Sequence, residues 1–155
     1  MSLNIVLYQP EIPHNTGSIG RTCVLTNTKL HLIKPLGFSV DDKMLKRAGL
    51  DYWKDIDITY YENFQEFYMI NSNKRIFLST TKATKFHSDV EFHDGDFIMF
   101  GRESSGVPED INNIFKDTQI RVPMVETTTR SLNLSNTASV VLYEAFRQIG
   151  YPYMK

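Results

Sequence analysis

Short apolar segments alternate with amphipathic segments along the whole chain, and this alternation restricts the possible folds more than any other feature of the sequence. The apolar segments are rich in β-branched and aromatic residues, which is typical of strands. We predict strands at residues 3–8, 29–35, 57–61, 75–81, 96–101 and 119–124. Since these strands are apolar throughout, the pattern predicts an α/β fold with a mostly parallel sheet and helices on both faces.

Helices are expected between most of these strands, and polar residues mark their ends. Asn15 or Thr16 can cap the first helix, and Pro108 suits the first position of a short helix that ends near residue 115. The last helix is expected from about Ser135 to Ile149, because its apolar residues recur at helical spacing. The predicted helices cover residues 14–27, 41–49, 62–71, 108–115 and 135–149.

The composition is that of one soluble globular domain. The 155 residues are close to the ~150 typical of a domain, so residues 1–155 are predicted to form a single unit. Hydrophobic residues make up 41% of the chain, and no apolar run approaches the roughly 18–20 residues of a membrane span. We see no signal peptide. The single Cys23 excludes an internal disulfide, so we expect a cytoplasmic protein with no membrane partner.

The formal net charge of −1 differs from that of proteins whose whole surface binds nucleic acid, since these are usually basic. Any binding of nucleic acid must therefore use a local patch, or a patch built by two subunits. The candidates are Lys43, Lys46 and Arg47. The alternative is that they form an ordinary solvated helix face.

Polar or glycine-rich segments follow four of the predicted strands, at residues 13–21, 79–84, 101–110 and 123–136. In parallel sheets, ligands bind in the crevice beyond the carboxyl ends of the strands. These four segments are therefore the candidate lining of a binding site.

Segment 101–110, GRESSGVPED, places Glu103 between Gly101 and Gly106. Glycines permit unusual backbone conformations and let a ligand approach the chain closely. The alternative is a plain strand-to-helix turn. The segment matches neither the GxGxxG fingerprint nor a Walker loop, which disfavours a classical dinucleotide site.

Segment 15–21, NTGSIGR, combines two glycines with a single charge, Arg21. An arginine on a glycine-opened helix can bind a phosphate or carboxylate through two hydrogen bonds. The alternative is a surface arginine on a helix whose glycines allow close packing. Neither a histidine spacing typical of metal sites nor a GxSxG nucleophile elbow occurs, so we expect no metal and no serine hydrolase.

Taken together, several blocks of the chain resemble the SPOUT superfamily of RNA methyltransferases, and more narrowly its small TrmL (YibK) type of tRNA 2′-O-methyltransferases. The resemblance covers essentially the whole chain, and the blocks around Arg21, Glu103 and Asn133 are specific in combination. The similar blocks are residues 4–23, 47–53, 78–84, 99–109, 120–124 and 130–152.

The resemblance implies a parallel-sheet domain with a deep trefoil knot near its C-terminus, and a homodimer. It implies S-adenosylmethionine as methyl donor, S-adenosylhomocysteine as product, and no metal. The acceptor that it implies is the ribose 2′-hydroxyl of the wobble nucleotide, a cytidine or modified uridine, in the anticodon loop of tRNA.

The resemblance also assigns site residues. Asn15, Arg21 and Glu103 match active-site positions, and Ser131 and Asn133 are expected beside the methyl group and the ribose. Because arginine stays protonated in proteins, we expect Arg21 to hold an RNA phosphate and to stabilise the developing alkoxide. The residues expected to bind the cofactor are Leu78, Ser79, Thr80, Gly101, Gly106, Val122, Met124, Ser131, Leu132 and Asn136.

Some alternatives remain open. Ser135 can cap the last helix while Asn133 only shapes a turn. The chain can act on another RNA, such as ribosomal RNA, or can be a binding module without catalysis. The last helix is expected to carry the dimer contact on part of its apolar stripe, which includes Val140, Val141, Leu142, Tyr143 and Phe146.

Overall fold

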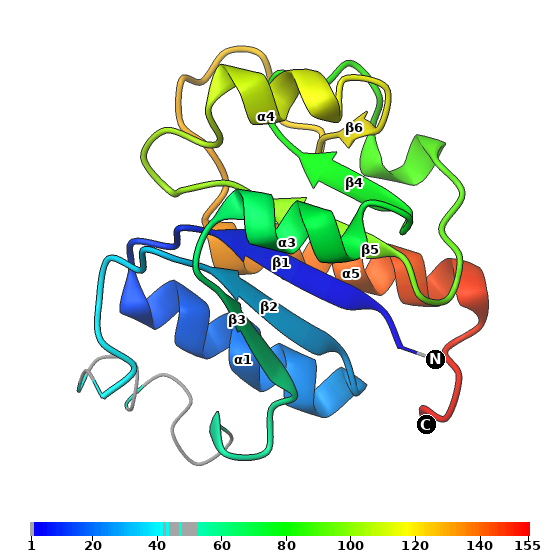
Figure 1. Cartoon of the computed structure of the whole chain (residues 1–155). Helices are drawn as coiled ribbons and strands as arrows, with labels where there is room; N and C mark the ends of the chain where they lie inside the picture. Colours follow the sequence, from blue (N-terminus) through cyan, green and yellow to red (C-terminus); the bar gives the residue numbers. More distant parts are fainter. Residues whose placement is uncertain (1, 42, 44–46, 48–52) are drawn as a thin grey trace.

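A single sheet organises the chain. The computed structural model describes residues 2–41, 43, 47 and 53–155 (Figure 1). Within these residues the strand order is β3-β2-β1-β5-β4-β6, and each neighbouring pair is parallel, which confirms the predicted α/β class. The strands are β1 (Asn4–Tyr8), β2 (Lys29–Ile33), β3 (Ile58–Tyr61), β4 (Ile76–Ser79), β5 (Phe97–Phe100) and β6 (Gln119–Ile120).

Helices cover both faces of the sheet, as Figure 1 shows. Ile5 and Leu7 of β1 point to one face, where they join a buried cluster with α1 and α5. Val6 and Tyr8 point to the other face and pack with α3 and the end of α4. The helices are α1 (Pro13–Thr26), α3 (Phe64–Asn71), α4 (Glu109–Ile114), α5 (Leu134–Ile149) and the short 3₁₀ helix η1 (His87–Asp89). None of the described helices is long and apolar enough to cross a membrane.

The first helix begins earlier than predicted. Helix α1 starts at Pro13, its N-cap residue is Ile12, and no side chain caps it there. Asn15 and Thr16 are buried inside the first turn, so the prediction that either one is the cap is wrong. Proline suits this position because its missing N–H is not needed in the first helical turn.

Other boundaries also differ from the prediction, and two of them bear on the site. Strand β6 comprises Gln119–Ile120 instead of extending to residue 124, and Arg121 continues it only as an isolated bridge to Phe86. The chain then leaves the sheet, which frees the following residues to line a pocket. Pro108 is the N-cap of α4 and not its first helical residue. Most of the helix predicted at 41–49 lies outside the described residues.

A buried chain of polar side chains joins β1, β2, β3 and α3. Nε2 of His31 lies 2.9 Å from Oδ1 of Asn4, and its Nδ1 lies 2.8 Å from the hydroxyl of Tyr61. The amide of Asn71 donates to the same hydroxyl. Burial lowers the pKa of His31 from 6.5 to about 4, so the imidazole is neutral at physiological pH.

Candidate active site

A pocket of about 550 Å³ lies beyond the carboxyl ends of β4, β5 and β6. Its walls come mainly from residues 78–82, 100–107, 121, 122, 124 and 131–134, together with Ile12 and Asn15 at the start of α1, Asn112 of α4 and Thr137 of α5. These are the segments that the sequence singled out after the strands. Most of the predicted site residues line it: Asn15, Leu78, Ser79, Thr80, Gly101, Glu103, Gly106, Val122, Met124, Ser131, Leu132 and Asn133.

Two predicted site residues do not belong to this lining. Arg21 is exposed on α1, about 9 Å further along the helix axis than Asn15. Asn136 is exposed in the first turn of α5, where its backbone N–H donates to the side chain of Asn133 at 3.3 Å. Arg21 therefore lies outside the pocket wall. Asn136 also lies outside it and is linked to it through its hydrogen bond to Asn133.

Two glutamates lock the loop after β1 to the loop after β5. The carboxylate of Glu103 accepts the backbone N–H groups of Glu11 and Ile12 at 2.9 and 2.8 Å. In return, the carboxylate of Glu11 accepts the backbone N–H and the hydroxyl of Ser104 at 2.9 and 2.8 Å. The hydrogen bonds from Ser104 hold the pKa of Glu11 below its ordinary value. Glu11 was not among the predicted site residues, because its partners are remote in sequence.

The Glu103 carboxylate also begins a series of oriented amides. Asn15 donates its Nδ2 to Oε2 of Glu103 at 3.3 Å, which turns its Oδ1 toward Asn133. Nδ2 of Asn133 donates to that oxygen at 3.1 Å. Oδ1 of Asn133 then accepts the backbone N–H groups of Ser135 and Asn136 at the start of α5. Because a carboxylate only accepts hydrogen bonds, it fixes the direction of both amides.

The N-cap of α5 is therefore Asn133. The hydroxyl of Ser135 donates to Oδ1 of Asn133 at 2.6 Å, so Ser135 supports the cap without being the cap residue. The alternative in which Ser135 caps the helix and Asn133 only shapes a turn is wrong. Asparagine is among the preferred N-cap residues because its oxygen reaches the free N–H groups of the first turn.

The two glycines of segment 101–110 first serve the turn itself. A Cβ on Gly101 would lie 2.6 Å from Cα of Gly106, and Gly106 has a φ of +66°. The backbone of Arg102 and that of Gly106 exchange two hydrogen bonds across this turn. The interpretation as a strand-to-helix turn is thus confirmed, and the same turn forms part of the pocket wall.

Two arginines that the sequence did not single out also line the pocket. Arg102 donates to Oε1 of Gln9 at 3.2 Å, and its guanidinium lies 5.3 Å from the centre of the Tyr8 ring. Arg121 donates to the carbonyl of Thr81 at 2.8 Å. Both lie in or beside the segments noted above, but no sequence signal separates them from ordinary loop arginines.

The pocket has the properties of a small-molecule site. Its volume lies within the range of roughly 300–1,000 Å³ that is usual for such sites. It combines apolar walls, such as Leu78 and Leu132, with amide and hydroxyl groups. Among the described residues, no three His, Cys, Asp or Glu side chains are grouped to hold a metal ion.

The chain is similar to known proteins over nearly its whole length. The model of the SpoU rRNA Methylase family matches residues 2–143. The tRNA (cytidine(34)-2′-O)-methyltransferase of Escherichia coli (strain K12) is 51% identical over 151 residues, which cover 97% of this chain and 96% of that protein.

Solved structures give the same result. One, described as "Structural insights into the 2-OH methylation of C/U34 on tRNA", has a TM-score of 0.90 and 40% identity, and the match covers 96% of each chain. The SpoU methyltransferase AviRb from Streptomyces viridochromogenes, in complex with the cofactor AdoMet, has a TM-score of 0.81 at 22% identity. That match covers 96% of this chain and 58% of AviRb, and it shows the fold alone.

Proposed function

This chain belongs to the SpoU rRNA methylase family, and we propose that it methylates the ribose 2′-hydroxyl of the wobble nucleotide of tRNA. The enzyme is a methyltransferase that uses S-adenosylmethionine, and its target is a cytidine or modified uridine at position 34 of the anticodon loop. The observation that carries this conclusion is the likeness, over nearly the full length of both chains, to the Escherichia coli enzyme named for cytidine 34.

The pocket fits the cofactor in size and in chemistry. S-adenosylmethionine supplies a methyl group on a positively charged sulfur, and S-adenosylhomocysteine is what remains after transfer. Backbone groups near Val122, Met124, Ser131 and Leu132 bind the adenosine part. The wall formed by Leu78, Ser79, Thr80, Gly101 and Gly106 encloses the rest. Asn136 acts indirectly, through its hydrogen bond to Asn133.

The protein must also position the ribose hydroxyl, because orienting the two reacting groups accounts for much of the activation barrier to such a transfer. Asn133 and Ser131 align the hydroxyl with the methyl group. Asn15 and Glu103 hold Asn133 in place through the series of oriented amides. Glu103 is in this view a positioning residue, because its carboxylate is occupied by backbone N–H groups.

Arg21 acts on the RNA side of the site. Its guanidinium stays charged and so is unsuited to act as a base. It holds the neighbouring phosphate and stabilises the negative charge that develops on the ribose oxygen. Its position outside the pocket lining is consistent with contact to RNA and not to the cofactor.

The assembly is also part of the proposal. The enzyme is a cytoplasmic homodimer, in which exposed apolar residues of α5 such as Val140 and Tyr143 contact the second subunit. The C-terminal part of the chain forms a deep trefoil knot, as the family resemblance implies. The whole chain, residues 1–155, acts as a single domain.

The proposal is tested by mapping 2′-O-methyl groups by mass spectrometry, in tRNA from cells with and without the gene. Loss of methylation at nucleotide 34 alone supports it. Loss of a methyl group from ribosomal RNA instead, with tRNA unchanged, contradicts it. Separately, S-adenosylmethionine and S-adenosylhomocysteine should each raise the melting temperature of the purified protein, because they bind the folded state only.

A further inference from the structure

A second hollow, of about 670 Å³, lies beyond the carboxyl ends of β2 and β3. We call it the β2–β3 groove. Among the residues that the structure describes, it shares no lining residue with the cofactor pocket. The proposed methyl transfer assigns no role to the residues of this groove. Its lining is Lys34, Pro35, Leu36, Phe38, Val40, Tyr60 and Glu62.

The walls of the β2–β3 groove suit a flat ring with an anionic attachment. Most of the lining is apolar, and Tyr60 as a residue is 38% exposed. The charged side chains among the described lining residues are Lys34 and Glu62. Nζ of Lys34 lies over the Tyr60 ring, 5.7 Å from its centre, so the groove combines a cation with an aromatic surface, and a base that stacks there displaces the flexible Lys34 side chain toward the phosphate. Proteins bind single-stranded nucleic acid through this combination, with bases on aromatic rings and cations on phosphates.

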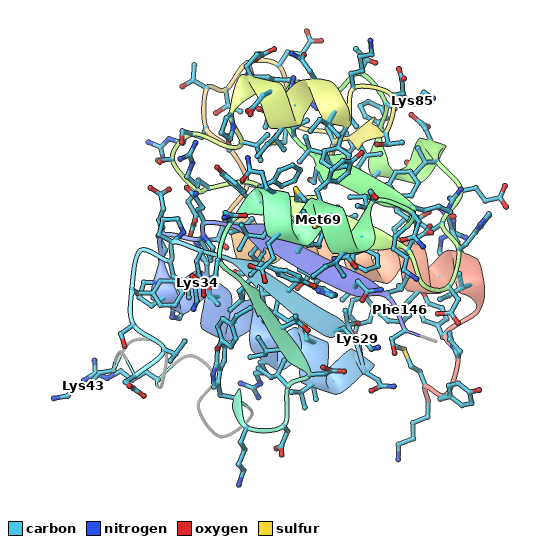
Figure 2. All side chains as sticks on the ribbon, viewed as in Figure 1. Lys29, Lys34, Lys43, Met69, Lys85 and Phe146 are labelled. Atoms are coloured by element: carbon cyan, nitrogen blue, oxygen red, sulfur yellow. The ribbon has the colours of Figure 1, made fainter. Side chains whose placement is uncertain are left out.

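Lys34 is available to a phosphate at low cost. It pairs with Glu62 at 3.3 Å, but the two side chains are 41% and 74% exposed. Such exposed pairs contribute little to stability, so a phosphate can replace the glutamate. Figure 2 shows Lys34 and the exposed Lys43 on the segment that follows β2. This edge of the sheet therefore offers more than one cation to an RNA backbone.

The β2–β3 groove adjoins the side of the cofactor pocket that the Glu103 loop forms. Its loop packs on the loop after β1: the N–H of Gly37 donates to the carbonyl of Pro10 at 2.9 Å. A Cβ on Gly37 would lie 2.9 Å from Cα of Glu11, and Glu11 is locked to the Glu103 loop of the pocket. Only β1 separates β2 from β5, so these two strands lie about 10 Å apart, and β3, which carries Tyr60, lies about 14 Å from β5. Bases splayed out from an unstacked loop point in different directions and can therefore reach separate sites along this sheet edge.

We propose that the β2–β3 groove binds a nucleobase of the anticodon loop that neighbours the methylated nucleotide. The base stacks on Tyr60, and Lys34 contacts its phosphate. This inference rests on the proposed function. It explains how a chain with a net charge of −1 can hold a splayed RNA loop, since stacking supplies affinity that does not depend on the net charge.

The test combines variants of the protein with abasic sites in the RNA. Wild type, Tyr60→Phe, Tyr60→Ala and Lys34→Gln are compared, with Met69→Ala as control, because Met69 is 80% exposed on α3 and does not line the groove. Each variant is assayed for its melting temperature, its affinity for S-adenosylmethionine and its KM for tRNA. The tRNA substrates carry an abasic nucleotide at each position that flanks the wobble nucleotide in turn.

Tyr60→Ala should weaken tRNA binding roughly 5- to 150-fold, the range that corresponds to one base–aromatic stack. Cofactor affinity should stay unchanged, and Tyr60→Phe should retain wild-type binding. A tRNA that is abasic at one of the flanking positions should bind wild type more weakly by a similar factor. The same abasic tRNA should bind Tyr60→Ala no more weakly than intact tRNA does.

The inference is overturned if Tyr60→Ala and Lys34→Gln both stay within twofold of wild type in KM for tRNA, or if every abasic effect persists unchanged in Tyr60→Ala. A wild-type protein that binds S-adenosylmethionine but methylates no tRNA would instead overturn the proposed function, and this inference with it.

Discussion

The side-chain amide of Asn133 makes contacts at both of its ends. Its oxygen caps α5, with the N–H of Ser135 at 2.9 Å, and its nitrogen donates to Asn15 at 3.1 Å. The first contact concerns stability and the second concerns the geometry of the site. Because the two contacts use different atoms, two substitutions can separate them.

Asn133→Asp should leave stability nearly unchanged, since aspartate is as good an N-cap as asparagine. It should lower methyl transfer about 100-fold, because the donor to Asn15 is lost and a misplacement of about 1 Å can have that effect. Asn133→Ala should lose the same activity and in addition about 1 kcal/mol of unfolding free energy. Urea unfolding and single-turnover assays check both variants. An Asn133→Asp variant with wild-type activity would contradict the series of oriented amides.

Arg21→Ala should lower methyl transfer by about 10²- to 10³-fold, the usual effect of removing one group that stabilises developing charge. Affinity for S-adenosylmethionine should remain nearly intact, because Arg21 does not line the pocket. The exposed Lys116, replaced by Ala, is the matched control. Activity is followed with labelled cofactor, and binding by calorimetry. Equal losses of activity and cofactor affinity would place Arg21 in the methionine site instead.

Most of the pocket lining was predictable from the sequence, because its segments follow strands and carry glycine or polar residues. The contacts between these segments were not predictable. Glu103 and Glu11 are far apart in the chain, and only the sheet order brings β1 beside β5. The same limit explains why Asn133 was left with two interpretations, since its cap and its link to Asn15 require coordinates.

At the level of elements, the order of strands and helices followed from the hydrophobic pattern, but several boundaries did not. Asn15 and Thr16 are good cap residues by type, yet α1 already begins at Pro13 and buries both. Strand β6 ends at Ile120 although Val122 and Met124 follow, because the chain turns to line the pocket. In the first case a proline at the first helical position decides the boundary, and in the second case tertiary packing overrides the local preference.

The buried polar chain through His31 makes the sheet sensitive to acid. The pKa of His31 falls from 6.5 to about 4 because of burial. Below pH 6.5 the unfolded chain therefore binds a proton that the folded chain does not take up until about pH 4. The contribution of neutral His31 to the free energy of unfolding is fully present above pH 6.5, and it is lost as the pH falls from 6.5 to 4.

The free energy of unfolding should thus drop by at most about 3 kcal/mol between pH 6.5 and 4 because of His31. His31→Gln should be less stable at pH 7 and should lack this part of the drop. His93→Gln is the control, since the side chain of His93 is 51% exposed. Urea unfolding at several pH values measures the effect. Identical pH slopes in wild type and His31→Gln would show that His31 is not responsible.

At the scale of the whole molecule, α5 carries apolar surface that the monomer does not cover. Val140 and Tyr143 are 40% and 44% exposed, whereas Val141, Leu142 and Phe146 are buried in the core. The predicted stripe is therefore divided, with one part in the core and another available to a second subunit. Exposed apolar patches of this kind are typical of interfaces.

Sedimentation equilibrium at micromolar concentration should give twice the chain mass of 17.9 kDa. Tyr143→Asp should shift the protein toward the monomer, because it places a charge in the interface. Met69→Asp, on the helix that covers the opposite face of the sheet, should stay dimeric. A wild-type mass near that of one chain would contradict the proposed dimer.

Methylation of the wobble ribose is the central claim, and the most direct test removes the acceptor oxygen alone. Two tRNAs are prepared that differ only by a 2′-deoxy ribose at nucleotide 34, and both are incubated with the enzyme and labelled S-adenosylmethionine. The ordinary tRNA should take up label, whereas the deoxy tRNA should take up none and should still compete for binding. Labelling of the deoxy tRNA at the normal rate would show that another atom is the acceptor.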